Sequence, residues 1–490
     1  MNMQNWMRAL ATHYTRSRER HPDERLLILF DIDGTILDMR YLVQFVLQGY
    51  DRAEGTSYFA DLDIDRIAVH ENHIAPLLAQ LALPGAVQDD VQRWFRQVCW
   101  SPVAVAAAHR PLRGVLEVIR WFQLQPGTFV GLNSGRSEFL RAASVNALNA
   151  LAAEYRVQFD ESLVFLHDGS AADVPAAKVE AVERARAAGY RVVAMIDNEP
   201  DNLRAVAAAD PNNEILLLHA DTIFESRRES MPGRGLSGHH YDLTELVQPG
   251  SLPRHVQFVW HGVQTDSNLR QFLASDAHWA EIDVDVHPLN RQACVAPMHG
   301  LNGDDDLTER LLLDEVLVRL RDGDRGLKLD LRSGGTLVDK LLRALGRHGY
   351  QHDELWFNGR IERLGEAGFR KLRRALPEAV VQCPVDFLVP LLLAAPQQAR
   401  EVLAMLRGWG IDRLSLDWQS DHKRTVIGRL EDWGYAVNIY NVPDLESFLQ
   451  AALLCPASVT SDFNFPKWRY HGLGGATDAA SYRYALREIA

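Results

Sequence analysis

The stretch Leu26–Leu37, read as LLILFDIDGTIL, decides how the first half of the chain folds. It begins with five consecutive apolar residues, Leu26 to Phe30, the pattern of a strand buried on both faces of a parallel sheet. Asp31 and Asp33 follow, and two carboxylates two residues apart at a strand end point to the same side. Gly34 lets the chain turn away at once. Because close like charges repel, this pair predicts a bound divalent cation or a shared proton, with one carboxylate free to attack or to donate a proton.

Further apolar runs that end in polar residues extend this sheet downstream. Thr128–Leu132 and Arg191–Ile196 are such runs, and Glu214–Leu218 is another buried strand. The alternation of predicted strands and helices indicates a doubly wound α/β sheet, whose functional residues lie at the carboxyl ends of the strands. The candidate residues at these ends, or at the start of the predicted helix that opens near Lys178, are Ser134, Gly135, Lys178, Asp197 and Asp201.

The motif Asp31-Ile32-Asp33-Gly34-Thr35, with these residues following in order, resembles the haloacid-dehalogenase (HAD) superfamily of phosphatases. The resemblance implies a phosphomonoesterase that forms an aspartyl-phosphate on Asp31 and uses Mg²⁺ as its cofactor. Its implied catalytic residues are Asp31, Asp33 and Lys178, its substrate-binding residues Thr35, Ser134 and Gly135, and its metal ligands Asp31, Asp33, Asp197 and Asp201.

Residues 38 to about 110 have a mostly helical pattern and lie between the first two motifs. An insertion at this place matches the helical cap of the HAD family, and such caps close over the site and select the substrate. Solvated helix faces explain the polar residues of this segment at least as well as substrate contacts do. The polar cap candidates are His70, Glu71, His73 and Arg93.

The second half of the chain has a different pattern. Glu225 to Gly238 is expected to be an exposed loop, and Gln248–Pro253, with two prolines and a glycine, is the best linker. We therefore predict a HAD-like domain at 1–248 and a second domain at 252–490. Eight strands separated by helices in the second domain predict a TIM barrel. The strands are Val256–His261, Trp279–Val286, Gly326–Arg332, Glu354–Arg360, Ala379–Val385, Arg413–Gln419, Tyr435–Val442 and Ala457–Phe463.

The period of two in these strands predicts which side chains face inward. Glu281, Asp283 and Asp285 share one face of the second strand, and Lys328, Asp330 and Arg332 share one face of the third. The polar set is expected to point inward near the mouth, where barrel enzymes carry out their chemistry. Polar residues at later strand ends are candidate substrate or supporting contacts: Asn358, Asp417, Gln419, Asn438 and Asp462.

His261-Gly262, Glu281-Ile-Asp283, His299 and Asp330 resemble the glycerophosphodiester-phosphodiesterase and phospholipase-C-like barrels, and locally their menorin-type relatives, over about residues 256–466. The resemblance implies that His261 and His299 act as acid and base. It implies a divalent cation, Mg²⁺ or Ca²⁺, bound by Glu281, Asp283 and Asp330. The usual His-Arg-Gly motif is His261-Gly262-Val263 here, so Lys328 or Arg332 is expected to take over the phosphate contact.

The composition of the chain argues against several classes of binding partner. A net charge of −13 and a pI near 5.8 argue against broad electrostatic binding to nucleic acid or to an anionic membrane. The four cysteines form no CxxC pair and suggest neither a zinc site nor a disulfide framework. No window approaches the ~20 apolar residues of a membrane span, and the first twenty residues do not read as a secretory signal. We expect a cytoplasmic protein acting on small phosphorylated substrates, while the sequence leaves its oligomeric state open.

The sequence as a whole predicts a bifunctional phosphate-ester hydrolase. The first domain would be a magnesium-dependent phosphatase. The second would be a metal-dependent phosphodiesterase that cleaves a small glycerophosphodiester-like substrate to a monoester, from which the first domain would remove the phosphate. Two alternatives stay open. The barrel could be a catalytically inactive ligand-binding or scaffolding module, or the HAD fold could serve phosphoryl transfer or C–P cleavage.

Overall fold

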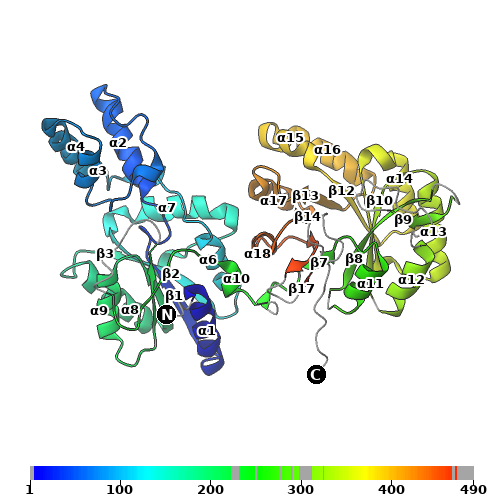
Figure 1. The fold of residues 1–490 in the computed structure, drawn as a ribbon, viewed down its shortest axis with the longest axis horizontal. Coiled ribbons are helices and arrows are strands. Elements are labelled where there is room, and N and C mark those ends of the chain that lie inside the picture. The colour runs from blue at the N-terminus through cyan, green and yellow to red at the C-terminus, as the bar shows by residue number, and fades with distance from the viewer. Residues whose placement is uncertain are drawn as a thin grey trace. The chain divides into compact units, whose positions relative to one another are not determined.

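The computed structural model of the chain forms two compact units, Met1–Gln248 and Pro249–Ala490, which divide within the predicted linker (Figure 1). The predicted acid–base residue His299 lies outside the part of the chain that the structure describes. The described residues are 5–221, 231–248, 251–275, 277–287, 291–296, 312–323, 325–465 and 470–471.

The first unit is built on six parallel strands in the order β3-β2-β1-β4-β5-β6. The central strand is β1, and all five apolar residues that predicted it are completely buried. The doubly wound α/β class is therefore confirmed. The strands are β1 (Arg25–Phe30), β2 (Thr128–Ser137), β3 (Val164–His167), β4 (Tyr190–Asp197), β5 (Leu216–Ala220) and β6 (Leu236–Gly238).

The sequence missed two of these strands, β3 and β6. The prediction of an exposed loop from Glu225 to Gly238 is wrong for its last three residues, which pair with β5. The Trp6 ring packs directly against the backbone at Gly238, where any Cβ atom would collide with it. This edge strand depends on a contact with a residue more than two hundred positions away, which local sequence patterns do not reveal.

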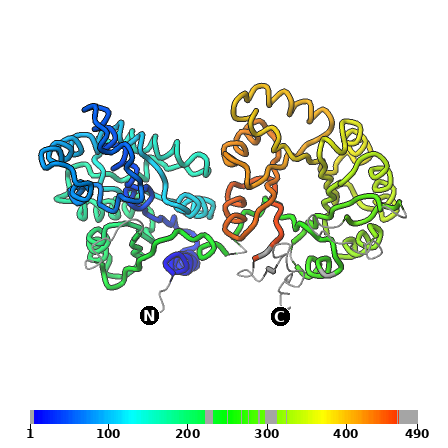
Figure 2. Tube along the Cα trace, turned by 45° about the horizontal axis from the view of Figure 1, so that its top comes forward, coloured from blue at the N-terminus to red at the C-terminus, as the bar shows by residue number. Residues whose placement is uncertain are grey.

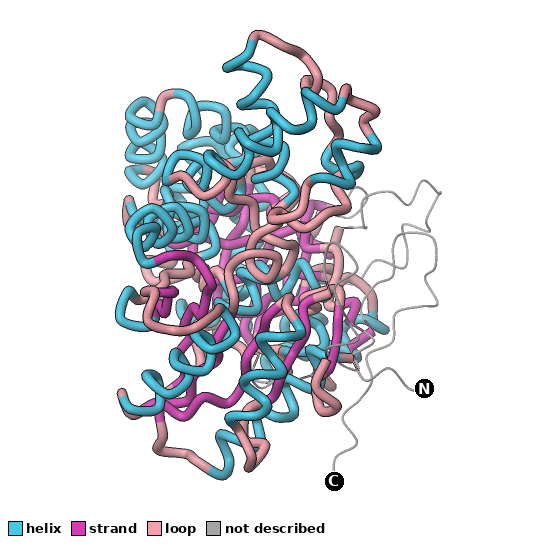
Figure 3. The backbone as a smooth tube through the Cα atoms, turned by 90° about the vertical axis from the view of Figure 1, so that its left-hand side faces the viewer, coloured by secondary structure: helices cyan, strands magenta, loops and turns pink. Residues whose placement is uncertain are grey.

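Helices cover both faces of the sheet. Leu27 and Leu29 of β1 join one apolar cluster with residues of α8 and α9, while on the other face Tyr14 of α1 packs against Trp121 and Phe122 of α6. The helices are α1 (Trp6–Arg20), α6 (Val115–Gln123), α7 (Arg141–Ala152), α8 (Val174–Ala187), α9 (Pro200–Ala209) and α10 (Leu243–Leu246). In Figure 3 the magenta strands run between cyan helices.

Helix α8 begins four residues before Lys178 rather than at it. The Asp173 side chain accepts a hydrogen bond from the backbone N–H of Ala176 at 2.9 Å and caps the helix there. Lys178 consequently lies in the second turn, with its side chain buried under the sheet end.

The predicted helical insertion lies between β1 and β2. Figure 1 shows α2, α3 and α4 as a group of helices that projects from the sheet. A loop between the short 3₁₀ helix Ile64–Arg66 and α3 contains residues 70–72, which return toward the carboxyl ends of the strands. The helices are α2 (Arg40–Glu54), α3 (Ala75–Gln80), α4 (Gly85–Val98) and α5 (Pro102–Ala107).

The second unit is a closed barrel of eight parallel strands, because β8 pairs with both β7 and β10 and completes the ring β7-β8-β10-β11-β12-β13-β14-β15 (Figure 2). All eight predicted strands are present, so the TIM barrel is confirmed. The short strand β9 (Ala293–Val295) was not predicted and pairs antiparallel with β8. The barrel strands are β7 (Gln257–Trp260), β8 (Trp279–Val286), β10 (Gly326–Leu331), β11 (Leu355–Gly359), β12 (Val380–Pro384), β13 (Arg413–Asp417), β14 (Ala436–Val442) and β15 (Ser458–Ser461).

Helices surround this barrel on the outside. They are α11 (Asp266–Leu273), α12 (Leu313–Asp322), α13 (Thr336–His348), α14 (Ile361–Ala375), α15 (Val389–Ala394), α16 (Pro396–Gly408), α17 (Lys423–Asp432) and α18 (Leu445–Leu453). Across the described ranges of both units, no helix combines the length and the apolar character needed to cross a membrane.

Candidate active sites

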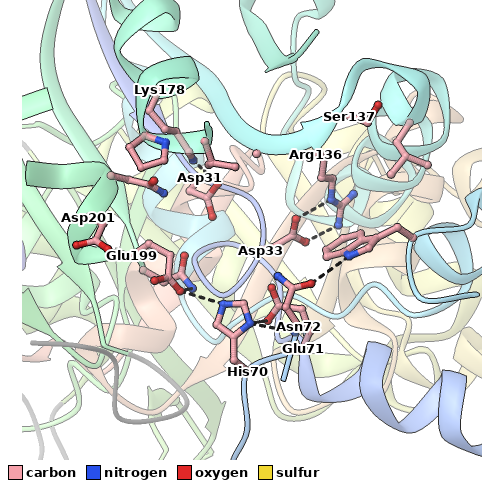
Figure 4. A pocket seen from close by; sticks show the side chains of 17 residues that line it. Asp31, Asp33, His70, Glu71, Asn72, Arg136, Ser137, Lys178, Glu199 and Asp201 are labelled. Atoms are coloured by element: carbon pink, nitrogen blue, oxygen red, sulfur yellow. Dashed lines mark hydrogen bonds and ion pairs between the residues drawn. The ribbon is translucent and has the colours of Figure 1, made fainter. Parts of the chain in front are cut away.

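The first site lies where β1 and β4 end. Asp31 follows β1, and its backbone N–H donates to the carbonyl of Ile196 in β4 at 2.8 Å. The buried amine of Lys178 lies between two carboxylates, 2.5 Å from Asp31 Oδ1 and 2.8 Å from Asp197 Oδ2. It also donates to the backbone carbonyl of Asn133 within β2, which runs on to Ser137 beyond the predicted strand end at Leu132. The predicted nucleophile Asp31, the lysine and Asp197 are thus brought together by three neighbouring strands and α8. Figure 4 shows Lys178 beside Asp31.

This group carries more negative than positive charge. Burial raises the pKa of Asp31 to about 8, with the carboxylates of Asp197 and Asp33 adding to the shift and the Lys178 amine opposing it. The pKa of Lys178 is raised as well, because its two carboxylate partners outweigh the effect of burial. A further cation at Asp31 and Asp197 would relieve this imbalance, so the carboxylates fit a divalent ion.

The two predicted ligands on the β4–α9 connection differ in their surroundings. Asp197 is completely buried and accepts hydrogen bonds from the backbone N–H of Glu199 at 2.8 Å and from Asn202 Nδ2 at 3.0 and 3.1 Å. The Asp201 side chain is 42% exposed, pairs with Arg204 at 2.8 Å and lines the cavity. Asn202, which sequence reasoning missed, therefore orients Asp197, and the short-range Asp-x-x-x-x-Asn spacing was the signal available for it.

Asp33 is held by a residue to which the sequence assigned no role. Arg136 Nε donates to Asp33 Oδ2 at 2.8 Å, and Nη2 donates to Oδ1 at 2.6 Å (Figure 4). The guanidinium is buried and is itself held by Ser144 Oγ, which accepts from Nη1 at 2.8 Å, and by a contact of 3.3 Å with His109 Nε2. This bidentate pair fixes the orientation of Asp33.

The three predicted phosphate contacts of this site lie close to the strand ends. Ser134 Oγ accepts from the backbone N–H of Arg136 at 3.2 Å, and Gly135 lines the cavity. A Cβ atom at Gly135 would come within 2.9 Å of Val174 Cγ1, so the absence of a side chain there keeps the backbone accessible. Thr35 is completely buried, and its hydroxyl has no hydrogen-bond partner among the described residues.

Asp31, Asp33 and Lys178 line a cavity of about 500 Å³. The lining residues do not include three of the predicted site residues: Thr35, Ser134 and Asp197. Of the four polar cap candidates, His70 and Glu71 line this cavity, and His73 and Arg93 are not among its lining residues. The cap also contributes Asn72 and Trp100, which sequence reasoning did not single out. The cap therefore forms one wall of the site.

A second cavity, of about 640 Å³, opens at the carboxyl ends of the barrel strands. Glu281 and Lys328 lie opposite one another on β8 and β10, with Lys328 Nζ 3.1 Å from Glu281 Oε2. The lysine also donates to Thr460 Oγ1 at 3.0 Å, and burial lowers its pKa. The predicted phosphate contact Lys328 thus already serves as the counter-ion of a predicted metal ligand.

Arg332 has a similar role beside the other two predicted ligands. Its guanidinium donates to Asp283 and lies 3.2 Å from Asp330 Oδ2, between two carboxylates that face each other across β8 and β10. Gln264 Nε2 also donates to Asp283 at 2.6 Å, and Asn358 Nδ2 donates to Asp330 at 2.7 Å. Burial and Asp283 raise the pKa of Asp330, although Arg332 opposes the shift. The chain's own cations therefore reduce the repulsion that suggested a metal here.

His261, the predicted acid or base that the structure describes, lies at the end of β7 and lines the cavity. Its Nδ1 is 2.6 Å from Asp462 Oδ1. Burial lowers the pKa of His261, but the hydrogen bond and charge of Asp462 outweigh that effect and raise the pKa to about 9. Asp462 and two other residues named at strand ends, Asn358 and Asp417, line the same cavity.

Arg360, directly after β11, was not proposed from the sequence. It is exposed and lines the barrel cavity, and its guanidinium has no ion pair or hydrogen bond within the described part of the chain. Lys328 and Arg332, by contrast, are both engaged by carboxylates. Arg360 is therefore the better placed of these cations to meet an anionic ligand, in place of the arginine missing after His261.

The grouping of ligand side chains does not decide whether either predicted metal ion binds. In the ranges that the structure describes, no three His, Cys, Asp or Glu side chains form a group that could hold a metal ion. Magnesium can be bound by one or two carboxylates with a backbone carbonyl, phosphate and water, so Asp31 and Asp197 remain a suitable pair. Mg²⁺ in the first unit and a divalent cation in the barrel stay predictions.

No family model and no curated protein matches this chain. Solved structures include an Oleispira antarctica phosphodiesterase in complex with sn-glycerol-3-phosphate (15% identity, 45% of this chain, 94% of that chain, TM-score 0.33). A glycerophosphodiester phosphodiesterase from Agrobacterium tumefaciens shares 16% identity over 38% of this chain and 85% of its own, with a TM-score of 0.28. The haloacid dehalogenase-like protein SP0104 from Streptococcus pneumoniae shares 11% identity over 43% of this chain and 93% of its own, with a TM-score of 0.29. The structural neighbours thus include both kinds of protein that the sequence resembles.

Proposed function

We propose that the chain is a bifunctional phosphate-ester hydrolase. The first unit would act as a phosphomonoesterase, and the barrel would cleave a small glycerophosphodiester-like substrate to a monoester. The observation that carries the proposal is the position of Lys178 between the carboxylates of Asp31 and Asp197, at the strand ends that border an open cavity. This arrangement holds a nucleophilic carboxylate, a cation and a second carboxylate within reach of one phosphate group.

In the first half-reaction, Asp31 Oδ attacks phosphorus while the bond from phosphorus to the alcohol oxygen breaks. The products are an aspartyl-phosphate and an alcohol that has taken its proton from Asp33. Lys178, Ser134 and Thr35 would stabilise the phosphoryl oxygens as negative charge builds up on them.

In the second half-reaction, a water molecule attacks the phosphorus of the aspartyl-phosphate. Asp33 takes a proton from this water, inorganic phosphate leaves, and the carboxylate of Asp31 is regenerated. The bidentate contact with Arg136 suits both half-reactions, because it holds the Asp33 carboxyl in one orientation. Arg136 is therefore proposed as the positioning residue of the acid–base group.

Asp31 and Asp197 would hold Mg²⁺, with Asp33 and Asp201 as the further candidate ligands. When bound, this ion would neutralise the charge of the carboxylates and the phosphate. The excess of buried carboxylate around Lys178 supports this assignment.

In the barrel, His261 with its partner Asp462 is proposed to deliver a proton to the leaving alkoxide, and His299 to act as the base. Arg360 is proposed to contact the phosphate. Glu281 and Asp330, which face the cavity, and Asp283 beside them would hold the divalent cation. An ion at these carboxylates would polarise the phosphoryl oxygen.

A second candidate function has an observation in its favour. Lys328 and Arg332 pair with all three proposed ligands, so the barrel site is largely charge-balanced without a metal. This favours a barrel that binds a phosphorylated ligand without hydrolysing it, in which case only the first unit is an enzyme.

Two variants of the full-length protein distinguish these functions. Asp31→Asn should abolish hydrolysis of p-nitrophenyl phosphate while leaving hydrolysis of bis-p-nitrophenyl phosphate intact, and His261→Ala should do the reverse. Assays with Mg²⁺, Mn²⁺ or Ca²⁺ would identify the cation. Asp23→Asn and His278→Ala, at exposed positions, are the matched controls.

Near-normal monoester turnover by Asp31→Asn would refute the proposed nucleophile. If the wild type hydrolyses no diester with any of the three cations, the barrel is a binding module.

A further inference from the structure

The cap loop His70–Asn72 places a buried carboxylate in the wall of the first cavity. Glu71 is 4% exposed, and its Oε2 atom is buried without a hydrogen-bond donor among the described residues. A buried carboxylate oxygen without a donor is costly, and native structures rarely leave one without a functional reason. Burial accordingly raises the pKa of Glu71 to about 7, and the nearby Asp33 carboxylate contributes to this shift while His70 opposes it.

The neighbouring imidazole does not supply the missing donor. His70 Nδ1 lies 3.4 Å from Glu71 Oε2, but it accepts the backbone N–H of Asn72 at 3.0 Å. The ring therefore makes no hydrogen bond to Glu71 Oε2, and the contact between the two side chains is electrostatic only. The other nitrogen, Nε2, faces Glu199 Oε1 at 3.0 Å and donates there (Figure 4).

The rest of this wall is held firmly and is also acidic. Trp100 Nε1 donates to Asn72 Oδ1 at 3.2 Å, which ties the indole to the loop. Lys178 and Arg136, which also line the cavity, are already paired with Asp31 and Asp33 at its base. Burial lowers the pKa of His70, but its carboxylate neighbours Glu199 and Glu71 outweigh burial and raise it, so this imidazole is the cation of the wall; two carboxylates face it, and the wall stays acidic.

We propose that this wall binds a positively charged leaving group, and that the preferred monoester is the phosphate of a small amino alcohol. The inference rests on the proposed phosphomonoesterase. An ammonium group has three N–H donors and a full positive charge, so it could satisfy Glu71 Oε2 and balance the charge of the wall. The indole of Trp100 is a suitable neighbour for such a cation.

An anionic leaving group, such as one that carries a carboxylate or a second phosphate, would be repelled here. It would meet the carboxylates of Glu71 and Glu199 without a free cation to pair with among the described lining residues. A neutral alcohol of the same size would leave Glu71 without its counter-charge. The wall thus ranks leaving groups by charge, in the order cation, neutral, anion.

The test compares three small phosphates with the full-length enzyme: O-phosphoethanolamine, propyl phosphate and 2-phosphoglycolate. We expect kcat/KM for phosphoethanolamine to exceed that for propyl phosphate about tenfold or more, as for hydrogen bonds to charged groups, and phosphoglycolate to be the poorest. In Glu71→Gln the preference for phosphoethanolamine over propyl phosphate should fall to near unity. Asp89→Asn, an exposed cap carboxylate, should keep the wild-type preference.

A second measurement needs no variant, so it decides the question even if Glu71→Gln does not fold. Ethanolamine should inhibit propyl phosphate hydrolysis competitively in the wild type, and 1-propanol at the same concentration should not. Equal inhibition by the two alcohols overturns the proposal.

Wild-type preference for propyl phosphate or phosphoglycolate also overturns it, as does an unchanged preference in a folded Glu71→Gln. These failures leave the phosphomonoesterase itself standing. If the wild type hydrolyses none of the three and no p-nitrophenyl phosphate, both the proposed function and the leaving-group site are wrong.

Discussion

Replacing Lys178 with methionine tests the central arrangement of the first site. Methionine has a similar length and shape but no charge, so Lys178→Met removes the cation and leaves most of the packing in place. The change leaves Asp31 and Asp197 buried side by side without the amine that lies 2.5 and 2.8 Å from them.

Breaking a buried ion pair by removing one partner costs about 3 to 5 kcal/mol, because a buried charge is left uncompensated. For a unit of this size, each kcal/mol shifts the unfolding midpoint by about 2 to 4 °C. We therefore expect the Tm of the first unit to fall by about 6 to 20 °C in the absence of divalent ions.

Scanning calorimetry of the full-length protein in EDTA, and then with excess Mg²⁺, measures this shift. Mg²⁺ should restore a large part of the lost stability, since a divalent ion at Asp31 and Asp197 supplies the missing positive charge. Lys371→Met, at an exposed position in the barrel unit, should leave the transition of the first unit unchanged.

A double variant sharpens the result. Asp31→Asn added to Lys178→Met removes one of the two stranded charges, so the double variant should be more stable than the single lysine variant. A fall of less than about 2 °C in Lys178→Met, or additive losses in the double variant, would show that the buried charge does not control the stability of this site.

Three further predictions concern single groups. Arg360→Gln should raise KM for the diester about tenfold with kcat nearly unchanged. Arg374→Gln, on the exposed surface of α14, should change neither constant. An unchanged KM in Arg360→Gln would show that Arg360 does not contact the substrate. Burial, aided by the charge of Arg136, lowers the pKa of His109 from 6.5 to about 4. The neutral His109 imidazole therefore contributes up to about 3 kcal/mol to the free energy of unfolding. This contribution is fully present above pH 6.5 and is lost as the pH falls through 4. Denaturant titrations between pH 7 and about 4 should show a flatter dependence for His109→Gln, and parallel curves would contradict this reading. Asp462→Asn should lower the pKa of His261 from about 9, as measured by NMR titration of the ring, and an unmoved titration would mean that Asp462 does not set it.

The sequence by itself determined the two folds and named most residues of the first candidate site. Burial and strand periodicity are local properties, so an apolar run that ends in DIDGT predicted β1, and alternating residues predicted all eight barrel strands. The carboxyl ends of parallel strands meet at one edge, which is why the order of residues along the chain was enough to place Asp31, Ser134 and Asp197 together.

Only the tertiary structure decided how these groups are paired. Asp33 and Arg136 are 103 residues apart, and His70 meets Glu199 across 129 residues. The register of β8 against β10 sets Asp283 opposite Asp330 and brings Arg332 to both. A pairing of this kind depends on which residues lie opposite each other when distant strands and loops pack, and a shift of one residue would reverse every side chain. Periodicity within a strand predicts the face on which a charged side chain lies, whereas packing decides which side chain pairs with it across the sheet.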